Sequence, residues 1–263
     1  MQKLLLHPPL MTMKLELFAI PGIPLIQPGD DLPGIVLAAA AAAGMTWRDG
    51  DVLALAQKIV SKAEGRLVHL PEVQPSARAR ELAGQTGKDP RLVQVILEES
   101  TEVLRARPGL LVVEHRLGFV CANAGVDQSN VAGSDDWALL LPLDPDASAR
   151  RLRDAIRASA GSAVAVIVCD SHGRAWRFGT VGVAIGVAGL HPLSDLRGRA
   201  DLTGRPLQIT EVGTADEIAA AAGLLMGQAG EQRPAVLVRG AAFGAGEGRL
   251  AEILRPKALD LFR

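Results

Sequence analysis

Hydrophobic positions along the chain follow two different spacings, which predict a mixture of strands and helices. Short apolar or alternating runs predict strands at 14–17, 52–56, 110–114, 119–122, 163–169 and 235–239. Capping residues or prolines before a helical spacing predict helices from Asp30 or Asp31 to about Gly44, and over 75–86, 90–104, 145–160 and 215–226. Residues 20–26 hold two prolines and a glycine, so no regular helix is expected there.

These strands and helices do not alternate strictly, which favours an α+β fold over a doubly wound sheet. We expect mixed, largely antiparallel sheets with helices, arranged as two interlocked subdomains. A length of 263 residues suits one large domain or two small interlocked ones, and no repeat or linker divides the chain. Residues 1–12 are expected to be a dispensable extension, because Met11 and Met13 offer later starts.

Charge and composition exclude several classes of partner. The chain has 28 Lys and Arg against 29 Asp and Glu, so it lacks the positive excess of nucleic-acid coats and polybasic membrane binders. Aromatic residues make up 3%, which argues against stacking on single-stranded nucleic acid. The longest apolar stretch, 35–47, is too short to span a bilayer, and no secretory signal is recognisable. We therefore expect a cytoplasmic protein.

Several catalytic signatures do not occur in the sequence. Gly87-Lys88 is followed by Asp89, so there is no standard P-loop, and the glycines of 244–248 lie too near the end of the chain to open a dinucleotide-binding unit. C-x-x-C, H-E-x-x-H and G-x-S-x-G spacings are also missing, which argues against zinc and serine hydrolase sites. Cys121 and Cys169 lie in apolar runs and are expected to be buried reduced thiols.

Polar segments follow three of the predicted strands. Residues 123–130 hold two Asn, an Asp, a Ser and a Gln, which suit either a turn or a site for Mg²⁺ or Mn²⁺. In the second segment, Asp170 and Ser171 can bind a metal, and Arg174 and Arg177 can bind phosphate or carboxylate; a structural ion pair is the alternative. His172 fits a base or a phosphate donor, but a solvent-facing loop histidine is favoured.

The third polar segment is 57–65. Lys58 and Lys62 are four residues apart and share a face if the segment is helical. Two ammonium groups repel each other unless an anion lies between them, so the pair indicates a phosphate site; an exposed basic loop is the alternative. Acids for a metal together with lysines and arginines for phosphates indicate metal-assisted phosphoryl transfer.

The same segments resemble the coenzyme F420-0:L-glutamate ligases, also called F420 γ-glutamyl ligases. The matching strings run in order from about Ile20 to Gly240 and include IPGIPLIQPGDDL, GDVLALAQKIVSKAEGR, VEHRLGFVCANAGVDQSN and VAIGVAGLHPLSDLRGRADLTGR. The resemblance implies a GTP-dependent ligase that joins L-glutamate to the phospholactyl carboxylate of coenzyme F420-0 and then adds γ-linked glutamates. It also implies Mn²⁺ or Mg²⁺, with K⁺ as a further cation, and an intertwined homodimer. The catalytic domain would span 13–250, followed by a tail at 251–263.

The resemblance also assigns site residues by motif. The metal ligands would be Asp127, Asp170, Ser171 and Gln228. The GTP contacts would be Ile23, Pro24, Leu25, Ile26, Gln57, Lys58, Lys62, Asn130, Met226, Gly227, Gln228, Ala229, Gly230, Glu231, Gln232 and Arg233. Within 226–233, only Met226-Gly227-Gln228 carries the match.

The implied chemistry is physically reasonable, because a carboxylate is a poor electrophile until phosphorylation by GTP converts it to an acyl phosphate. The sequence identifies no base for the attacking amine. Two alternatives remain open. One is an amide ligase of the same fold with another acceptor, and the other is a non-catalytic protein that binds a metal or a nucleotide.

Overall fold

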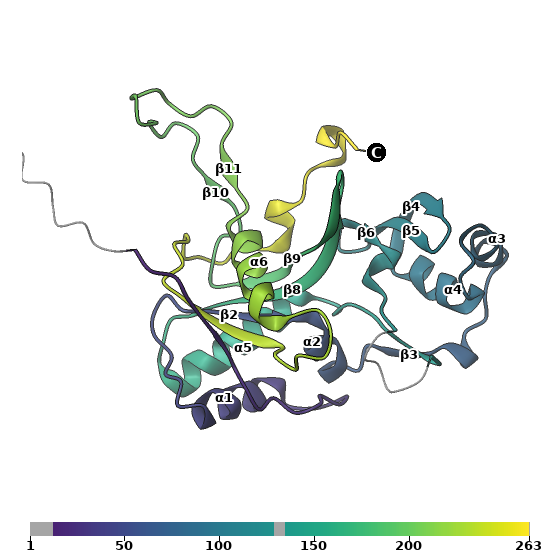
Figure 1. The fold of residues 1–263 in the computed structure, drawn as a ribbon, viewed down its shortest axis with the longest axis horizontal. Coiled ribbons are helices and arrows are strands. Elements are labelled where there is room, and N and C mark those ends of the chain that lie inside the picture. Colours follow the sequence, from purple (N-terminus) through teal and green to yellow (C-terminus); the bar gives the residue numbers. More distant parts are fainter. Residues whose placement is uncertain (1–12, 129–134, 263) are drawn as a thin grey trace, which may run out of the picture.

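A computed structural model describes residues 13–128 and 135–262 as a large and a small lobe (Figure 1). The large lobe contains a five-stranded sheet in the order β1-β12-β2-β8-β9. β2 and β8 are parallel, and the other neighbouring pairs are antiparallel. The fold is therefore α+β with mixed and antiparallel sheets, as the sequence predicts. The strands are β1 (Glu16–Ala19), β2 (Val52–Ala56), β8 (Ala165–Arg174), β9 (Arg177–Ala188) and β12 (Ala235–Arg239).

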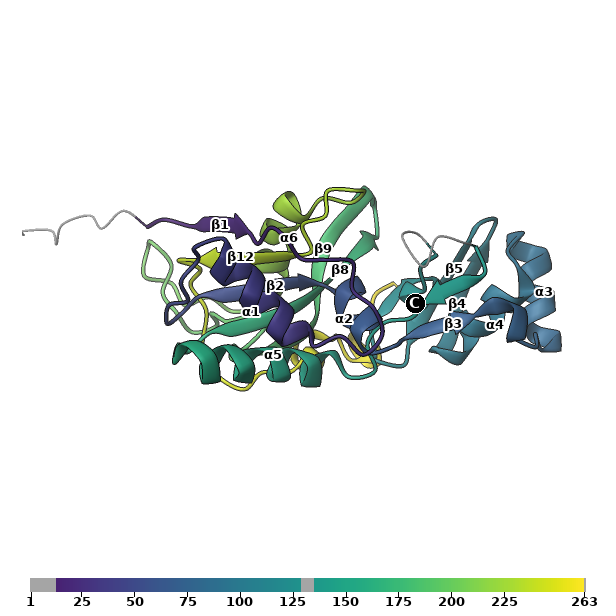
Figure 2. The ribbon, with the colours of Figure 1, turned by 90° about the horizontal axis from the view of Figure 1, so that it is seen from below.

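Helices cover both faces of this sheet (Figure 2). Successive side chains of a strand point to opposite faces, so Val166 and Val168 of β8 belong to one core, while Ala165 and Ile167 belong to the other. The first core lies under α1 (Leu32–Ala42) and α5 (Pro145–Ala160), and the second lies under α6 (Thr214–Met226). The large lobe is thus a three-layer arrangement with the sheet in the middle.

Two glycines of β9 permit the close approach of these helices. A Cβ atom on Gly182 would lie 2.6 Å from the carbonyl oxygen of Ala219 in α6. A Cβ atom on Gly186 would lie 2.5 Å from Pro145 in α5. Any side chain at either position would force a helix away from the sheet, which explains why this apolar strand is rich in glycine.

The small lobe has its own sheet and its own core. Helices α3 and α4 pack with a three-stranded antiparallel sheet, and buried side chains such as Leu82, Ile96 and Val113 lie between them. A separate two-stranded ladder is formed by β3 and β7. The elements of the lobe are β3 (Leu67–His69), α3 (Ala77–Thr86), α4 (Pro90–Glu98), β4 (Ser100–Arg107), β5 (Leu110–His115), β6 (Val120–Ala122) and β7 (Trp137–Leu139), with short 3₁₀ turns at Leu70–Glu72 and Asn123–Gly125.

Two further segments extend from the large lobe. Strands β10 (Ser194–Asp195) and β11 (Glu211–Val212) form the base of an arm, residues 194–212, that projects away from the sheet (Figure 1). The C-terminal segment 250–262, which includes the turns Leu250–Ile253 and Lys257–Leu259, reaches the small lobe. There the Lys257 Nζ atom lies 3.0 Å from Glu102 Oε2 and 2.7 Å from Glu114 Oε2. This segment therefore connects the two lobes.

Several predicted elements need correction. The helix predicted over 90–104 ends at Glu98, because residues 100–107 pair with β5 as a strand. The strand predicted at 163–169 continues to Arg174, paired with β9 in a long hairpin. Both thiols are free and buried, as predicted. Across the described part of the chain, no helix is both long and apolar enough to cross a membrane.

Candidate active site at the carboxyl ends of two parallel strands

The parallel pair β2 and β8 brings two of the polar segments together. Their register pairs Ala56 with Cys169, so Gln57 and Asp170 follow at the carboxyl end of the parallel ladder, beyond which β8 continues in its hairpin with β9. In sheets that contain parallel strands, this edge is where ligands commonly bind. Helix α2 (Gln57–Ala63) starts directly from β2, and the buried Gln57 side chain accepts a hydrogen bond of 2.8 Å from Ser61 Oγ.

Helix α2 carries the two lysines on one face, as the spacing predicts, and Asp127 lies against them. The Lys58 Nζ atom lies 2.6 Å from Asp127 Oδ2. The backbone of Asp127 is fixed by two hydrogen bonds with Leu139, of 3.0 and 2.8 Å. Burial lowers the pKa of Lys62, and the charge of Lys58 lowers it further, while Asp127 opposes the shift. The ammonium form of Lys62 is therefore disfavoured, and the charge of a bound anion would relieve this.

Asp170 and His172 lie on the same face of β8, two residues apart. His172 Nε2 lies 3.0 Å from Asp170 Oδ2, and only 13% of the histidine side chain is exposed. The prediction of a solvent-facing loop histidine is therefore wrong. It failed because the strand does not end at Cys169 but continues through His172, which pairs with Val181 of β9.

Ser171 points to the opposite face of β8, toward the end of α6. Its hydroxyl donates a hydrogen bond of 2.8 Å to Gln228 Oε1. Gln228 opens the loop between α6 and β12, and the loop ends beside α2, since the Ala56 amide donates to the Pro234 carbonyl at 2.8 Å. Three of the predicted metal ligands thus lie on two faces of the sheet, Asp170 on the α5 side and Ser171 with Gln228 on the α6 side, while Asp127 comes from a segment outside this sheet.

The remaining predicted nucleotide contacts lie in two loops. Ile26 is buried in the core, whereas Leu25 is exposed. The same loop is attached to the end of α2, because the Gly29 amide donates to the Ala63 carbonyl at 2.9 Å. In the α6–β12 loop, residues 229–233 are exposed, and within this segment the Ala229 amide donates to the Glu231 side chain. Asn130 lies outside the described residues.

The donor atoms of the four predicted ligands fit a hard divalent cation. Two carboxylates, one hydroxyl and one amide oxygen form the all-oxygen set that Mg²⁺ and Mn²⁺ prefer. Within residues 13–128 and 135–262, no three His, Cys, Asp or Glu side chains cluster closely enough to hold a metal by themselves. Water or phosphate oxygens would therefore complete the coordination, as is usual for Mg²⁺ bound with a nucleotide.

Three further side chains lie near Asp170. Burial raises the pKa of Cys121 to about 12, and the charge of Asp170 contributes to the same shift. Burial and Asp170 also raise the pKa of Cys169. Both thiols are therefore protonated at neutral pH and are not thiolate nucleophiles. The third side chain is Phe119, whose ring packs on His172 with centroids 5.2 Å apart.

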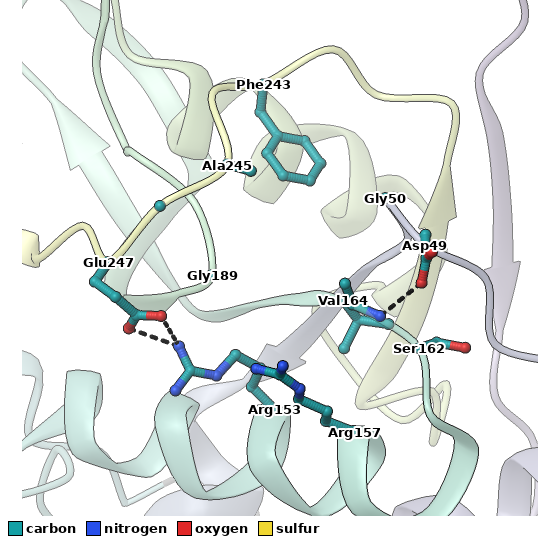
Figure 3. Close-up of a pocket in the computed structure, with 12 residues that line it drawn as sticks. Asp49, Gly50, Arg153, Arg157, Ser162, Val164, Gly189, Phe243, Ala245 and Glu247 are labelled. Atoms are coloured by element: carbon teal, nitrogen blue, oxygen red, sulfur yellow. Dashed lines mark hydrogen bonds and ion pairs between the residues drawn. The ribbon is translucent and has the colours of Figure 1, made fainter.

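A cavity of about 320 Å³ lies at the other end of β2 and β8, beside Gly50 and Val164 (Figure 3). Several of its charged groups have protein partners: Arg153 forms an ion pair with Glu247, and Asp49 Oδ1 accepts a hydrogen bond of 2.7 Å from the Ala163 amide. Within the described part of the chain, none of the residues predicted to bind GTP or metal lines this cavity. The candidate site is therefore at the opposite, carboxyl end of the strands.

The residues of this arrangement lie within a segment that is similar to a known protein family. A family model described as F420-0:Gamma-glutamyl ligase matches residues 22–240, which include the strand ends, α2 and the loop after α6. The chain belongs to the F420-0:gamma-glutamyl ligase family. The resemblance noted in the sequence is thereby confirmed, whereas the domain bounds of 13–250 remain a prediction.

Members of this family from archaea align along nearly the whole chain. The coenzyme F420:L-glutamate ligase of Methanothermobacter thermautotrophicus is 47% identical over 95% of this chain and 100% of its own length. The enzyme of the same name from Archaeoglobus fulgidus is 47% identical over 95% of this chain and 97% of its own. The enzyme of the same name from Methanosarcina mazei is 38% identical over 95% of this chain and 96% of its own length.

Proposed function

We propose that this protein is a coenzyme F420:L-glutamate ligase. It uses GTP to join L-glutamate to the phospholactyl carboxylate of coenzyme F420-0, then adds further γ-linked glutamates. Full-length similarity to relatives of that name supports the activity. The single structural observation that carries the proposal is the contact of Asp127 with the lysines of α2, the helix that follows β2 where the neighbouring strand β8 carries Asp170.

The lysine face of α2 is the proposed binding site for the phosphates of GTP. Lys58 and Lys62 supply two positive charges on consecutive turns of one short helix, and the pKa of Lys62 is lowered first by burial and then by the charge of Lys58. A triphosphate between them would replace repulsion with charge-assisted hydrogen bonds. The loop around Ile23–Ile26, which is attached to α2, and the α6–β12 loop are the proposed walls of the nucleotide site.

Asp127, Asp170, Ser171 and Gln228 are the residues that would hold Mn²⁺ or Mg²⁺, and K⁺ is a further cation of the proposal. When bound, a divalent cation withdraws charge from phosphate oxygens and helps to orient them. The chain's own groups do the rest of the positioning. In particular, the ion pair between Lys58 and Asp127 connects the helix of the large lobe to the small lobe.

The proposed reaction has two steps, a phosphoryl transfer and the formation of an amide. An oxygen of the acceptor carboxylate attacks the γ-phosphorus of GTP, the bond to the β-phosphate oxygen breaks, and GDP leaves. The amine of L-glutamate then attacks the carbon of the acyl phosphate, loses a proton, and displaces inorganic phosphate to leave an amide. Neutralisation of the phosphates by Lys58 and Lys62 lowers the barrier of the first step, and alignment of the amine with the acyl carbon lowers that of the second.

The homodimer is also part of the proposal. Leu202 and Ile209 on the projecting arm are exposed, as are Trp176 and Phe178 at the tip of the β8–β9 hairpin. Exposed apolar side chains on projecting segments are typical of surfaces that bind another protein. We expect a second copy of this chain to cover them, which light scattering on the purified protein can test. The cytoplasmic location likewise remains a prediction.

The decisive experiment incubates the enzyme with GTP, Mn²⁺, L-glutamate and coenzyme F420-0, and follows product mass for added glutamates. Glutamate addition coupled to GDP release supports the ligase, and its loss in Asp170→Asn but not in Asp154→Asn, an exposed acid on α5, locates the site. GDP release without glutamate addition would identify an amide ligase for another acceptor. A protein that does not bind GTP at all would be the non-catalytic alternative.

A further inference from the structure

The contact between His172 and Asp170 has a geometry suited to positioning. A carboxylate only accepts hydrogen bonds, so the Nε2 atom of His172 is the donor to Asp170 Oδ2 at 3.0 Å. Among the described residues, His172 is the hydrogen-bond partner of the Asp170 carboxylate. Rotation about the last torsion of aspartate is broad and has no sharp minimum, so a single directional donor decides where the two oxygens point.

The histidine ring is itself held in place from the small lobe. Phe119 packs on it with ring centroids 5.2 Å apart at 50°. Phe119 in turn stacks on His115 at 5.2 Å and 7°, and His115 is fully buried. With 13% of its side chain exposed, His172 has little freedom to turn away from Asp170. The donor is therefore supported by rigid packing.

We propose that His172 is a positioning residue that holds Oδ2 of Asp170 and directs Oδ1 toward the divalent cation. This inference rests on the proposed function, because it concerns the metal that Asp170 would bind there. Hydrogen-bonded partners that orient a metal ligand commonly contribute 10- to 100-fold to metal affinity. The role requires an N–H group held where it can donate to Asp170 Oδ2.

The test measures binding of Mn²⁺ alone to the full-length enzyme, from the electron paramagnetic resonance signal of free Mn²⁺. His172→Phe keeps a ring against Phe119 but removes the donor, and we expect its Mn²⁺ affinity to fall about tenfold. His172→Gln restores an N–H group and is expected to stay within about threefold of the wild type. The matched control is His191→Phe, since His191 also has a carboxylate neighbour, Glu252 at 3.7 Å, but belongs to another part of the fold.

The outcomes distinguish a failure of the positioning role of His172 from a failure of the proposed metal site. Wild-type protein that binds no Mn²⁺ overturns the metal assignment and this inference with it. Wild-type binding with equal affinity in His172→Phe, or no recovery in a folded His172→Gln, overturns the inference and leaves the metal assignment intact. A pulsed measurement on the wild type needs no variant: a nitrogen coupling to Mn²⁺ from an imidazole would make His172 a ligand and overturn the positioning role.

Discussion

Two groups of charged side chains lie in or beside the small lobe, one around Glu99 and the other around Asp127. Arg66 and Arg116 each donate to Glu99 Oε2 at 2.9 Å, and the acid is 11% exposed. Burial alone would raise the pKa of Glu99, but hydrogen bonds from His115 and Arg116 and the charge of Arg66 lower it to about 2. Every charge in this group is directed at one buried carboxylate.

The group around Asp127 has the same formal composition, one acid and two cations, but a different arrangement. Lys58 pairs with Asp127 at 2.6 Å, while the pKa of Lys62 is lowered by burial and by Lys58. The protein therefore stabilises the charges of the first group and disfavours a charge in the second. The comparison shows that the arrangement of charges, more than their number, distinguishes a structural cluster from a site prepared for an anion.

The largest expected effect is on catalysis at the carboxyl ends of β2 and β8. Asp170→Asn and Asp127→Asn each remove a proposed metal ligand while keeping the side chain's shape. We expect kcat to fall at least about 100-fold, the scale of losing one stabilising group in a transition state. Steady-state GDP release checks this, with the melting temperature as the control for folding. Full activity in both variants would remove the distinction between the two charged groups.

Glu99→Gln is expected to lower the stability of the protein and to leave its catalysis unchanged. It leaves the half-buried Arg66 and Arg116 without their buried carboxylate, so the free energy of unfolding should fall by about 3 kcal/mol. The turnover number of the remaining folded enzyme should stay near the wild-type value. Urea unfolding followed by circular dichroism measures the first quantity, and active-site-normalised assays measure the second. A stable Glu99→Gln protein with impaired catalysis would place this group in the active site instead.

The pH dependence of stability sharpens the same contrast. Because the pKa of Glu99 is lowered to about 2 in the folded protein, its contribution to stability is present above its unfolded pKa, near 4.3, and is lost as the pH falls toward 2. Wild-type stability should therefore decline over this range more steeply than that of Glu99→Gln. Urea midpoints at a series of pH values measure the difference, and parallel curves would contradict it.

Lys62→Met should give the smallest of these effects. The variant removes one charged hydrogen bond to the nucleotide, worth about 1.5 kcal/mol, so KM for GTP should rise about tenfold. The free energy of unfolding should not fall, because methionine tolerates burial better than an ammonium whose charge is already disfavoured. Titration with GTP and urea unfolding test the two statements. Lys88→Met, at another half-buried lysine, is the matched control.

Much of this arrangement could be predicted because its signals are local. The four-residue spacing placed Lys58 and Lys62 on one helical face, and the apolar run before Asp170 placed this residue just beyond the part of β8 that pairs with β2, although not at the end of the strand. The contact of His172 could not be predicted, because it depends on the extension of β8 by pairing with Val181. The Glu99 group was equally hidden, since Arg66 lies 33 residues away in sequence. Non-local pairing decides both features.

The C-terminal segment has a consequence for how this enzyme can be altered. Lys257 is bound to Glu102 and Glu114 of the small lobe, while Leu250, at the start of the same segment, donates to Asp146 of the large lobe at 3.1 Å. The angle between the lobes, and with it the distance separating Asp127 from Asp170, thus depends partly on residues that touch neither carboxylate. Substitutions in this segment can therefore adapt the enzyme to heat or cold without changing the residues that carry out its chemistry.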